Sequence, residues 1–235
     1  MLGAVQGIAE VVPVSSSAQL TLLPYLAGWE PEKDRTTFAA ALHAGSALGI
    51  FLALKNDHDA GTAKRTLAFA VPAAVAGLVG QKRVEQRLGG IAPTAGLLAI
   101  AGIAMWAADL RPASRPLTTP ALNAASLAQV AALAPGVSRS GATLTALRAQ
   151  QVDRHEAFRY TLHSSLPITV GAAGLTAIRA RRAPELLPTA AAAAASYAAA
   201  RAVNGGSHRL IPSAAIYRLA MAALVAGRLI REKKR

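Results

Sequence analysis

The stretch Pro135-Gly136-Val137-Ser138-Arg139-Ser140-Gly141-Ala142-Thr143 decides how this chain folds. It carries one arginine and three hydroxyls between two largely apolar segments, residues 127–134 and 144–147. A charge in such surroundings faces a protein interior or a wet cavity, and backbone bent by proline and glycine is tolerated at membrane depth only where it lines such a cavity. A guanidinium beside the N–H groups that open a helix suits phosphate. We therefore predict phosphate contacts from Gly136, Ser138, Arg139, Ser140, Gly141 and Thr143.

The composition is that of a membrane protein. Of the 235 residues, 53% are apolar and 16% are charged, and the mean hydropathy is +0.34. Soluble domains usually carry about 25% charged residues. The apolar residues fall in blocks of roughly 15–20 between short charged loops, which is typical of helices that cross a bilayer. We predict one all-α integral membrane domain over residues 1–235 with about six transmembrane helices, at residues 37–54, 67–80, 91–108, 157–178, 186–203 and 211–230.

The charge of the chain and its lack of cysteine exclude several classes of function. The net charge is +13, which in a soluble protein would indicate nucleic acid as a partner. Here the basic residues lie in the loops and in the tail 231–235, where they indicate anionic lipid head groups and a cytoplasmic C-terminus. We therefore expect a bilayer and no nucleic acid as partners. Without cysteine, disulfides and thiol chemistry are excluded.

A second broken apolar segment lies at the start of the chain. Residues 2–12 and 20–26 are mostly apolar, and Pro13-Val14-Ser15-Ser16-Ser17 separates them. Neither part is long enough to span a bilayer, so we predict a re-entrant helix–break–helix here and a second one over residues 122–147. The alanine run 190–195 predicts a close helix-packing face.

The two broken segments belong to an internal repeat. Two patterns recur in the same order at offsets of 123 and 120 residues. They are Gln6, Val14, Ser15 and Ser17, repeated as Gln129, Val137, Ser138 and Ser140, and Phe38-x-x-x-Leu42-His43, repeated as Phe158-x-x-x-Leu162-His163. Three predicted spans lie between the two breaks, so we predict an inverted-topology repeat, with a first unit over about residues 1–108 and a second over about 120–232. The two units would meet at a site near the bilayer midplane.

Both broken segments resemble the signatures of a known family. Gln6-x-x-x-Glu10 followed by Pro13-Val14-Ser15-Ser16, together with residues 135–143, resembles the bacterial undecaprenyl-pyrophosphate phosphatases, the bacitracin-resistance membrane phosphatases. The similarity extends to Ile211-Pro212 and Ile216-Tyr217-Arg218 in the last span. The resemblance implies an inverted-repeat membrane fold whose site opens to the outer face of the bacterial plasma membrane. It implies hydrolysis of undecaprenyl pyrophosphate to undecaprenyl phosphate with a divalent cation (Mg²⁺ or Ca²⁺), and it is compatible with a homodimer.

The resemblance also assigns roles to individual residues. The acidic pair of the first signature falls on Gln6 and Glu10, its serine on Ser16 and its phosphate-binding arginine on Arg139. Glu10 would ligate the metal together with Gln6, or act as a general base. Ser16 would be the nucleophile if Glu10 activates it; otherwise water attacks directly and the serines of the break cap the next helix. We also expect substrate contacts from Ser15, Ser17 and Gln19.

One position departs from the family pattern. The first signature usually ends Ser-Ser-Thr-Gly-His, whereas this chain has Ser15-Ser16-Ser17-Ala18-Gln19. Glutamine cannot shuttle protons near neutral pH, so a carrier that flips polyprenyl phosphate without hydrolysis is the alternative to an enzyme. We interpret His43 and His163 as packed core histidines rather than replacements. We interpret Asp57-His58-Asp59 as a solvated turn rather than a metal cluster.

Overall fold

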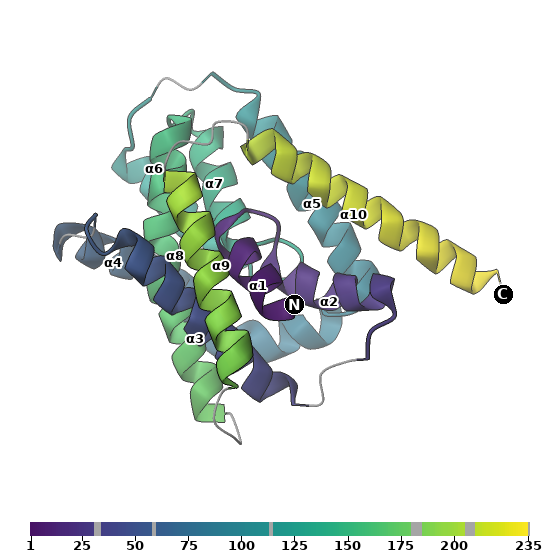
Figure 1. The fold of residues 1–235 in the computed structure, drawn as a ribbon. Helices are drawn as coiled ribbons and strands as arrows, with labels where there is room; N and C mark the ends of the chain where they lie inside the picture. Colours follow the sequence, from purple (N-terminus) through teal and green to yellow (C-terminus); the bar gives the residue numbers. More distant parts are fainter. Residues whose placement is uncertain (31–33, 58–59, 113–114, 180–184, 205–209, 235) are drawn as a thin grey trace.

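The computed structural model describes residues 1–30, 34–57, 60–112, 115–179, 185–204 and 210–234, and within these ranges it holds ten helices and no strand. The helices are α1 Leu2–Val11, α2 Ser16–Ala27, α3 Arg35–Leu54, α4 Ala60–Leu88, α5 Ile91–Asp109, α6 Thr119–Ala131, α7 Arg139–Ala149, α8 Arg154–Arg179, α9 Leu186–Asn204 and α10 Leu210–Lys233. The all-α prediction is confirmed. Both predicted breaks are present, between α1 and α2 and between α6 and α7 (Figure 1). Of the Asp57-His58-Asp59 turn, His58 and Asp59 lie outside the described residues.

Four helices in the described part of the chain are long and apolar enough to cross a membrane. They cover Thr37–Leu54, Gly61–Leu88, Ile91–Asp109 and Leu210–Lys233. The other two predicted spans, α8 and α9, have 26 and 19 residues and are not among these four. The protein is therefore an integral membrane protein whose helices differ in how apolar they are.

The alanine-rich helix α9 packs closely against α1 and α3. A Cβ atom at Gly7 of α1 would collide with the backbone of Ala192, and one at Gly49 of α3 would collide with Ala193 and Ser196. Only glycine at these two positions lets the helix backbones approach so closely, and such small-residue contacts hold helices together within a bilayer. The predicted packing face of residues 190–195 is confirmed.

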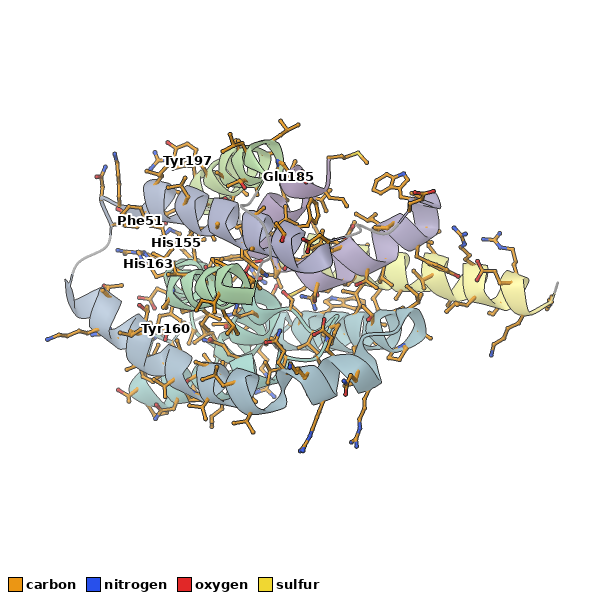
Figure 2. The ribbon with its side chains drawn as sticks, turned by 90° about the horizontal axis from the view of Figure 1, so that it is seen from below. Phe51, His155, Tyr160, His163, Glu185 and Tyr197 are labelled. Carbon is orange, nitrogen blue, oxygen red and sulfur yellow. The ribbon has the colours of Figure 1, made fainter. Side chains whose placement is uncertain are left out.

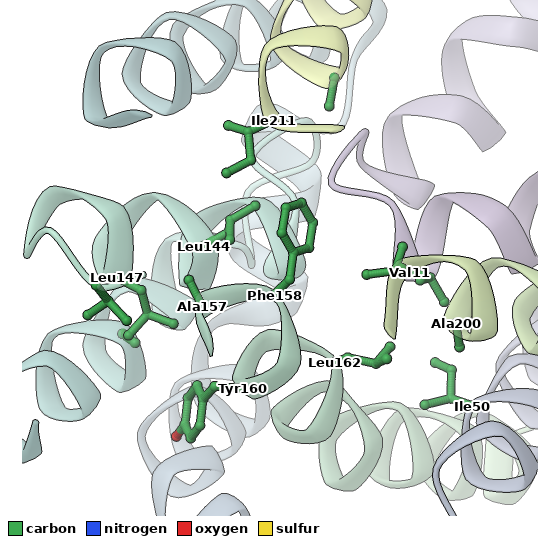
Figure 3. Close-up of a cluster of buried hydrophobic side chains, with 14 of the residues drawn as sticks. Val11, Ile50, Leu144, Leu147, Ala157, Phe158, Tyr160, Leu162, Ala200 and Ile211 are labelled. Atoms are coloured by element: carbon green, nitrogen blue, oxygen red, sulfur yellow. The ribbon is translucent and has the colours of Figure 1, made fainter. Parts of the chain in front are cut away.

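A buried apolar cluster joins the two ends of the sequence around α8. Phe158 and Leu162 of α8 lie among Val11 of α1, Leu144 of α7 and Ile211 of α10 (Figure 3). The short helix α1 thus lies inside the bundle, and α5 and α10 run side by side along one flank of it (Figure 1). This packing brings the first break next to the second.

Candidate active site

The two breaks have the same local structure. Ser15 caps α2 with φ 69°, and Ser138 caps α7 with φ 70°. Each hydroxyl accepts a hydrogen bond from the backbone N–H three residues ahead, at 3.4 Å from Ala18 and at 3.1 Å from Gly141. A left-handed backbone at a residue other than glycine costs about 1–3 kcal/mol and persists only where the surroundings impose it. The strain occurs at equivalent positions of the repeat pattern, so the surroundings impose the same backbone geometry on both breaks.

One buried arginine of α10 holds both breaks. Arg218 is 0% exposed, and its Nε donates to the Pro13 carbonyl oxygen at 2.6 Å. Its Nη1 donates to the Val137 carbonyl oxygen at 3.2 Å. A side chain at Gly141 would collide with the Arg218 guanidinium, so this position needs glycine. The guanidinium therefore satisfies one carbonyl from each break and sets the distance between them.

The carboxylate of Glu10 in α1 accepts hydrogen bonds from side chains of several helices. Its carboxylate, 4% exposed, accepts hydrogen bonds from Gln6 Nε2 at 2.8 Å and from Ser16 Oγ at 3.0 Å. Thr169 Oγ1 of α8 donates to it at 3.2 Å, and Arg139 of α7 forms an ion pair with it. Four helices thus supply one carboxylate with four donors.

The ion pair between Arg139 and Glu10 connects the two halves of the chain. The Arg139 side chain is 19% exposed, whereas that of Glu10 is 2% exposed, so the guanidinium is the part of the pair that a ligand can reach. An arginine at the start of a helix, beside free N–H groups, is a suitable binding element for phosphate. A phosphate bound here would compete with Glu10 for the guanidinium.

Gln6 and Glu10 provide oxygen ligands that suit a divalent cation. Gln6 Oε1 is buried and has no hydrogen-bond partner among the described residues, while the carboxylate of Glu10 lies one helical turn away. Amide and carboxylate oxygens are hard donors of the kind that Mg²⁺ and Ca²⁺ prefer. No group of three or more His, Cys, Asp or Glu side chains gathers within the described ranges, so water and phosphate oxygens would complete the coordination.

The comparison with known families decides the classification. The family described as Bacitracin resistance protein BacA matches residues 1–224. This chain belongs to the BacA family.

Curated relatives of this BacA-family chain are named undecaprenyl-diphosphatase. The protein of Pelobacter propionicus is 36% identical over 197 residues, which are 74% of this chain and 71% of the relative. The protein of Geobacter sulfurreducens is 37% identical over 195 residues, 73% of this chain and 72% of the relative. That of Campylobacter concisus is 32% identical over 209 residues, 80% of this chain and 78% of the relative.

The remaining predicted site residues of the BacA-family chain lie in the two breaks and at the starts of α2 and α7. Ser15 and Ser17 are hydroxyl neighbours at 3.2 Å, and so are Ser138 and Ser140. Thr143 Oγ1 donates to the Arg139 carbonyl oxygen at 3.0 Å. Gly136 has φ 103° and lies against the α5 backbone, where a Cβ atom would collide. The substrate contacts predicted for these residues and for Gly141 stay predictions.

Gln19, which stands where the BacA family usually has histidine, does not contact Glu10. Its Nε2 donates to the Val14 carbonyl oxygen at 2.9 Å, and its Oε1 accepts from the Tyr217 hydroxyl at 2.6 Å. Both ends of the amide are therefore engaged in holding the first break against α10. Its predicted contact with substrate stays a prediction.

Sequence reasoning assigned no role to several residues that the fold brings to this site. Thr169 of α8 and Arg218 of α10 are among them. His43 of α3 is another, since its imidazole lies near Glu10 and Arg139. Its Nδ1 is buried without a partner in the described part of the chain. The repeated pattern of Phe38, Leu42 and His43 was the signal for this last residue.

We expect Arg218→Met to weaken both stability and turnover. The change leaves the carbonyls of Pro13 and Val137 without their donor, at about 1–3 kcal/mol for each buried group. The melting temperature should fall by about 5 °C or more, because 1 kcal/mol corresponds to about 2–4 °C in a chain of this size. Thermal unfolding in detergent measures the shift, and Arg87→Met on the exposed side of α4 is the matched control. Equal melting temperatures for the two variants would contradict the bridging role.

Proposed function

We propose that this membrane protein hydrolyses undecaprenyl diphosphate to undecaprenyl phosphate and inorganic phosphate, which recycles the lipid carrier of cell-wall synthesis. The observation that carries the proposal is the Glu10 carboxylate, which joins the Ser16 hydroxyl to the Arg139 guanidinium. A nucleophile paired with a base beside a phosphate-binding cation is the minimum that phosphoryl transfer needs. The names of the family and of the curated relatives support it. They give no support to a carrier without hydrolysis.

The geometry supports a reaction in two steps. Arg139 binds the terminal phosphate and neutralises its charge, while Glu10 accepts the proton of Ser16 as its oxygen attacks phosphorus. The bridging P–O bond then breaks, and undecaprenyl phosphate leaves with the electron pair and takes up the proton from Glu10. Water, deprotonated by Glu10 or His43, then attacks the phosphorus. The bond between phosphorus and the Ser16 oxygen breaks, Ser16 takes the proton back, and inorganic phosphate is released. If water occupies the place of the Ser16 hydroxyl, the same carboxylate activates it directly and the first step is omitted.

The proposal includes a divalent cation that Gln6 and Glu10 would hold. These two oxygen donors would hold Mg²⁺ or Ca²⁺ next to the phosphates, where the ion would neutralise charge on the non-bridging oxygens. We further place the protein in the bacterial plasma membrane, as a multi-pass protein whose partner is the polyprenyl lipid. The homodimer and the exclusion of nucleic acid stay predictions from the sequence.

The direct test is release of inorganic phosphate from undecaprenyl diphosphate by the purified protein in detergent, with Mg²⁺ and with a chelator. The proposal predicts phosphate release that stops on chelation and returns with Mg²⁺. Absence of release from protein that still binds undecaprenyl phosphate would overturn the enzyme and favour the carrier. Equal release of phosphate with and without the chelator would contradict the role of the metal but not the hydrolysis.

We expect His43→Gln to change the dependence of the rate on pH. A neutral imidazole next to Glu10 can accept a proton, and general-base catalysis contributes about 10²–10⁴-fold. The variant should lose about 10²-fold in kcat and should no longer show the fall in rate at acidic pH that protonation of the imidazole causes. The matched control is His163→Gln, at the equivalent position of the repeat in α8. A pH profile for His43→Gln that matches the wild type would leave His43 a packed side chain.

We expect Gln6→Leu to raise the concentration of Mg²⁺ needed for half-maximal activity. Leucine keeps the volume of the side chain but removes the free amide oxygen, and loss of a metal ligand or its support costs about 10–100-fold in affinity. A titration of phosphate release with Mg²⁺ measures the change. Gln129→Leu, at the equivalent position of the second half, should leave the titration unchanged. An unchanged titration for Gln6→Leu would remove Gln6 from the metal site.

A further inference from the structure

A second polar cavity lies between α4 and α8, apart from the Glu10 centre. Its volume is about 200 Å³, and its lining comes from Arg65 and Thr66 of α4 and from Arg159, Tyr160 and His163 of α8, with Glu156 at its edge. Figure 2 labels Tyr160 and His163 on α8 near α4. None of these residues takes part in the chemistry proposed above.

The mouth of this cavity carries a net positive charge. Arg65 and Arg159 are both exposed and extend from neighbouring helices. Glu156 is the one acidic residue among the described residues of the lining, and its Oε2 accepts a hydrogen bond from the Leu117 backbone N–H at 3.1 Å. The two guanidiniums outweigh this single carboxylate, so the mouth attracts anions, and guanidinium binds phosphate oxygens in a forked geometry.

The floor of the cavity offers a hydroxyl that lacks a partner. Tyr160 is 7% exposed, and its hydroxyl oxygen is buried with no hydrogen bond to any described residue. A buried hydroxyl left without a partner costs free energy that a ligand oxygen would recover. Tyr160 lines the same cavity as the two arginines, so its hydroxyl is a candidate donor to the same anion.

The surroundings of the cavity fit a ligand that comes from the bilayer. Arg65 lies near the start of the candidate span Gly61–Leu88, so the mouth is near the level of the lipid head groups. Directly after it, Leu67 and Val71 are 62% and 53% exposed and form an apolar surface along α4. A lipid could therefore place its phosphate on the arginines and its hydrocarbon chain along α4.

We propose that the cavity between α4 and α8 is a binding site for the phosphate group of an anionic ligand, separate from the reaction centre. The shared chemistry is a phosphate with net negative charge, supplied by a lipid head group or by free phosphate. Because the readout below is binding, it does not depend on hydrolysis. A failure of this inference is therefore distinct from a failure of the proposed function.

The test is lipid binding to the purified full chain by native mass spectrometry. The probes are dioleoyl phosphatidylglycerol, which is anionic, and dioleoyl phosphatidylcholine, which has no net charge. The variants are Arg65→Gln combined with Arg159→Gln, and Tyr160→Phe alone; Lys64→Gln, an exposed neighbour on α4 that does not line the cavity, is the control. The wild type should retain phosphatidylglycerol in preference to phosphatidylcholine. The double variant should bind phosphatidylglycerol about tenfold more weakly, and Tyr160→Phe about fivefold.

Competition with inorganic phosphate identifies the source of the ligand. Displacement of phosphatidylglycerol by millimolar phosphate, lost in the double variant, would assign free phosphate as a ligand of the site. Failure of phosphate to compete would assign the lipid head group. Equal retention of phosphatidylglycerol by the wild type and the double variant, or an equal loss in Lys64→Gln, would overturn the proposal. Hydrolysis by the double variant should equal that of the wild type, because neither arginine lies at the Glu10 centre.

Discussion

Replacing Arg139 with alanine should lower the rate of phosphate release from undecaprenyl diphosphate by about 10³-fold, the effect of removing one preorganised charge from a transition state. Arg139 follows the second break, and its guanidinium is the exposed member of the ion pair with Glu10. The hydrolysis of a diphosphate concentrates negative charge on the terminal phosphate, and positioning with electrostatics supplies most of the catalysis. Arg139→Lys should restore only a small part of the rate, because an ammonium cannot bind two oxygens in one plane.

The control for Arg139 is Arg201→Ala, at an exposed position of α9. This variant removes the same charge from the protein without touching the site, so its rate should stay that of the wild type. A comparison of kcat and KM in detergent separates loss of binding from loss of chemistry. A full rate in Arg139→Ala would show that another group neutralises the phosphate.

Replacing Glu10 with glutamine should lower kcat by about 10³-fold or more and leave a small residual rate. The amide has the size of the carboxylate and can still accept hydrogen bonds from Ser16 and Gln6, so the packing of α1 should survive. It cannot take up the proton of Ser16, and it releases Arg139 from its ion pair. Binding of the lipid diphosphate should therefore persist while the chemical step stops.

The control for Glu10 is Glu85→Gln, on the exposed side of α4. Thermal unfolding of both variants shows whether the fold is intact, and binding of undecaprenyl phosphate shows whether the site is formed. Hydrolysis by Glu10→Gln at the wild-type rate would remove Glu10 as the base. The proton would then have to pass through His43 or through water.

The sequence predicts the architecture of this site because polar residues are conspicuous within apolar segments. Gln6 and Glu10 are spaced to share one face of a helix, and the structure places them one turn apart with a hydrogen bond between them. The Pro-Val-Ser break ends α1 and the Pro-Gly break ends α6, both near the predicted residues. The predicted repeat brings the two breaks together at one site, and this proximity accounts for the ion pair between Arg139 and Glu10.

Other features depend on contacts that no local pattern contains. Arg218 binds carbonyls that lie 205 and 81 residues away in the sequence, and Tyr217 binds Gln19 from 198 residues away. Thr169 of α8 is another example, since it is buried and donates a hydrogen bond to Glu10, 159 residues away in the sequence. The length of α4, Ala60–Leu88 against the predicted 67–80, reflects polar turns that continue a helix past its apolar part.

The central claim is that one reaction centre, built from both halves of the chain, hydrolyses a lipid diphosphate. The most direct test is a double-mutant cycle on phosphate release from undecaprenyl diphosphate, with wild type, Glu10→Gln, Arg139→Ala and the double variant. Groups that act as a unit give losses that do not add. We predict that the double variant is no slower than the slower single variant. Losses that multiply in the double variant would show that Glu10 and Arg139 act independently, and would contradict a single centre shared by the two halves.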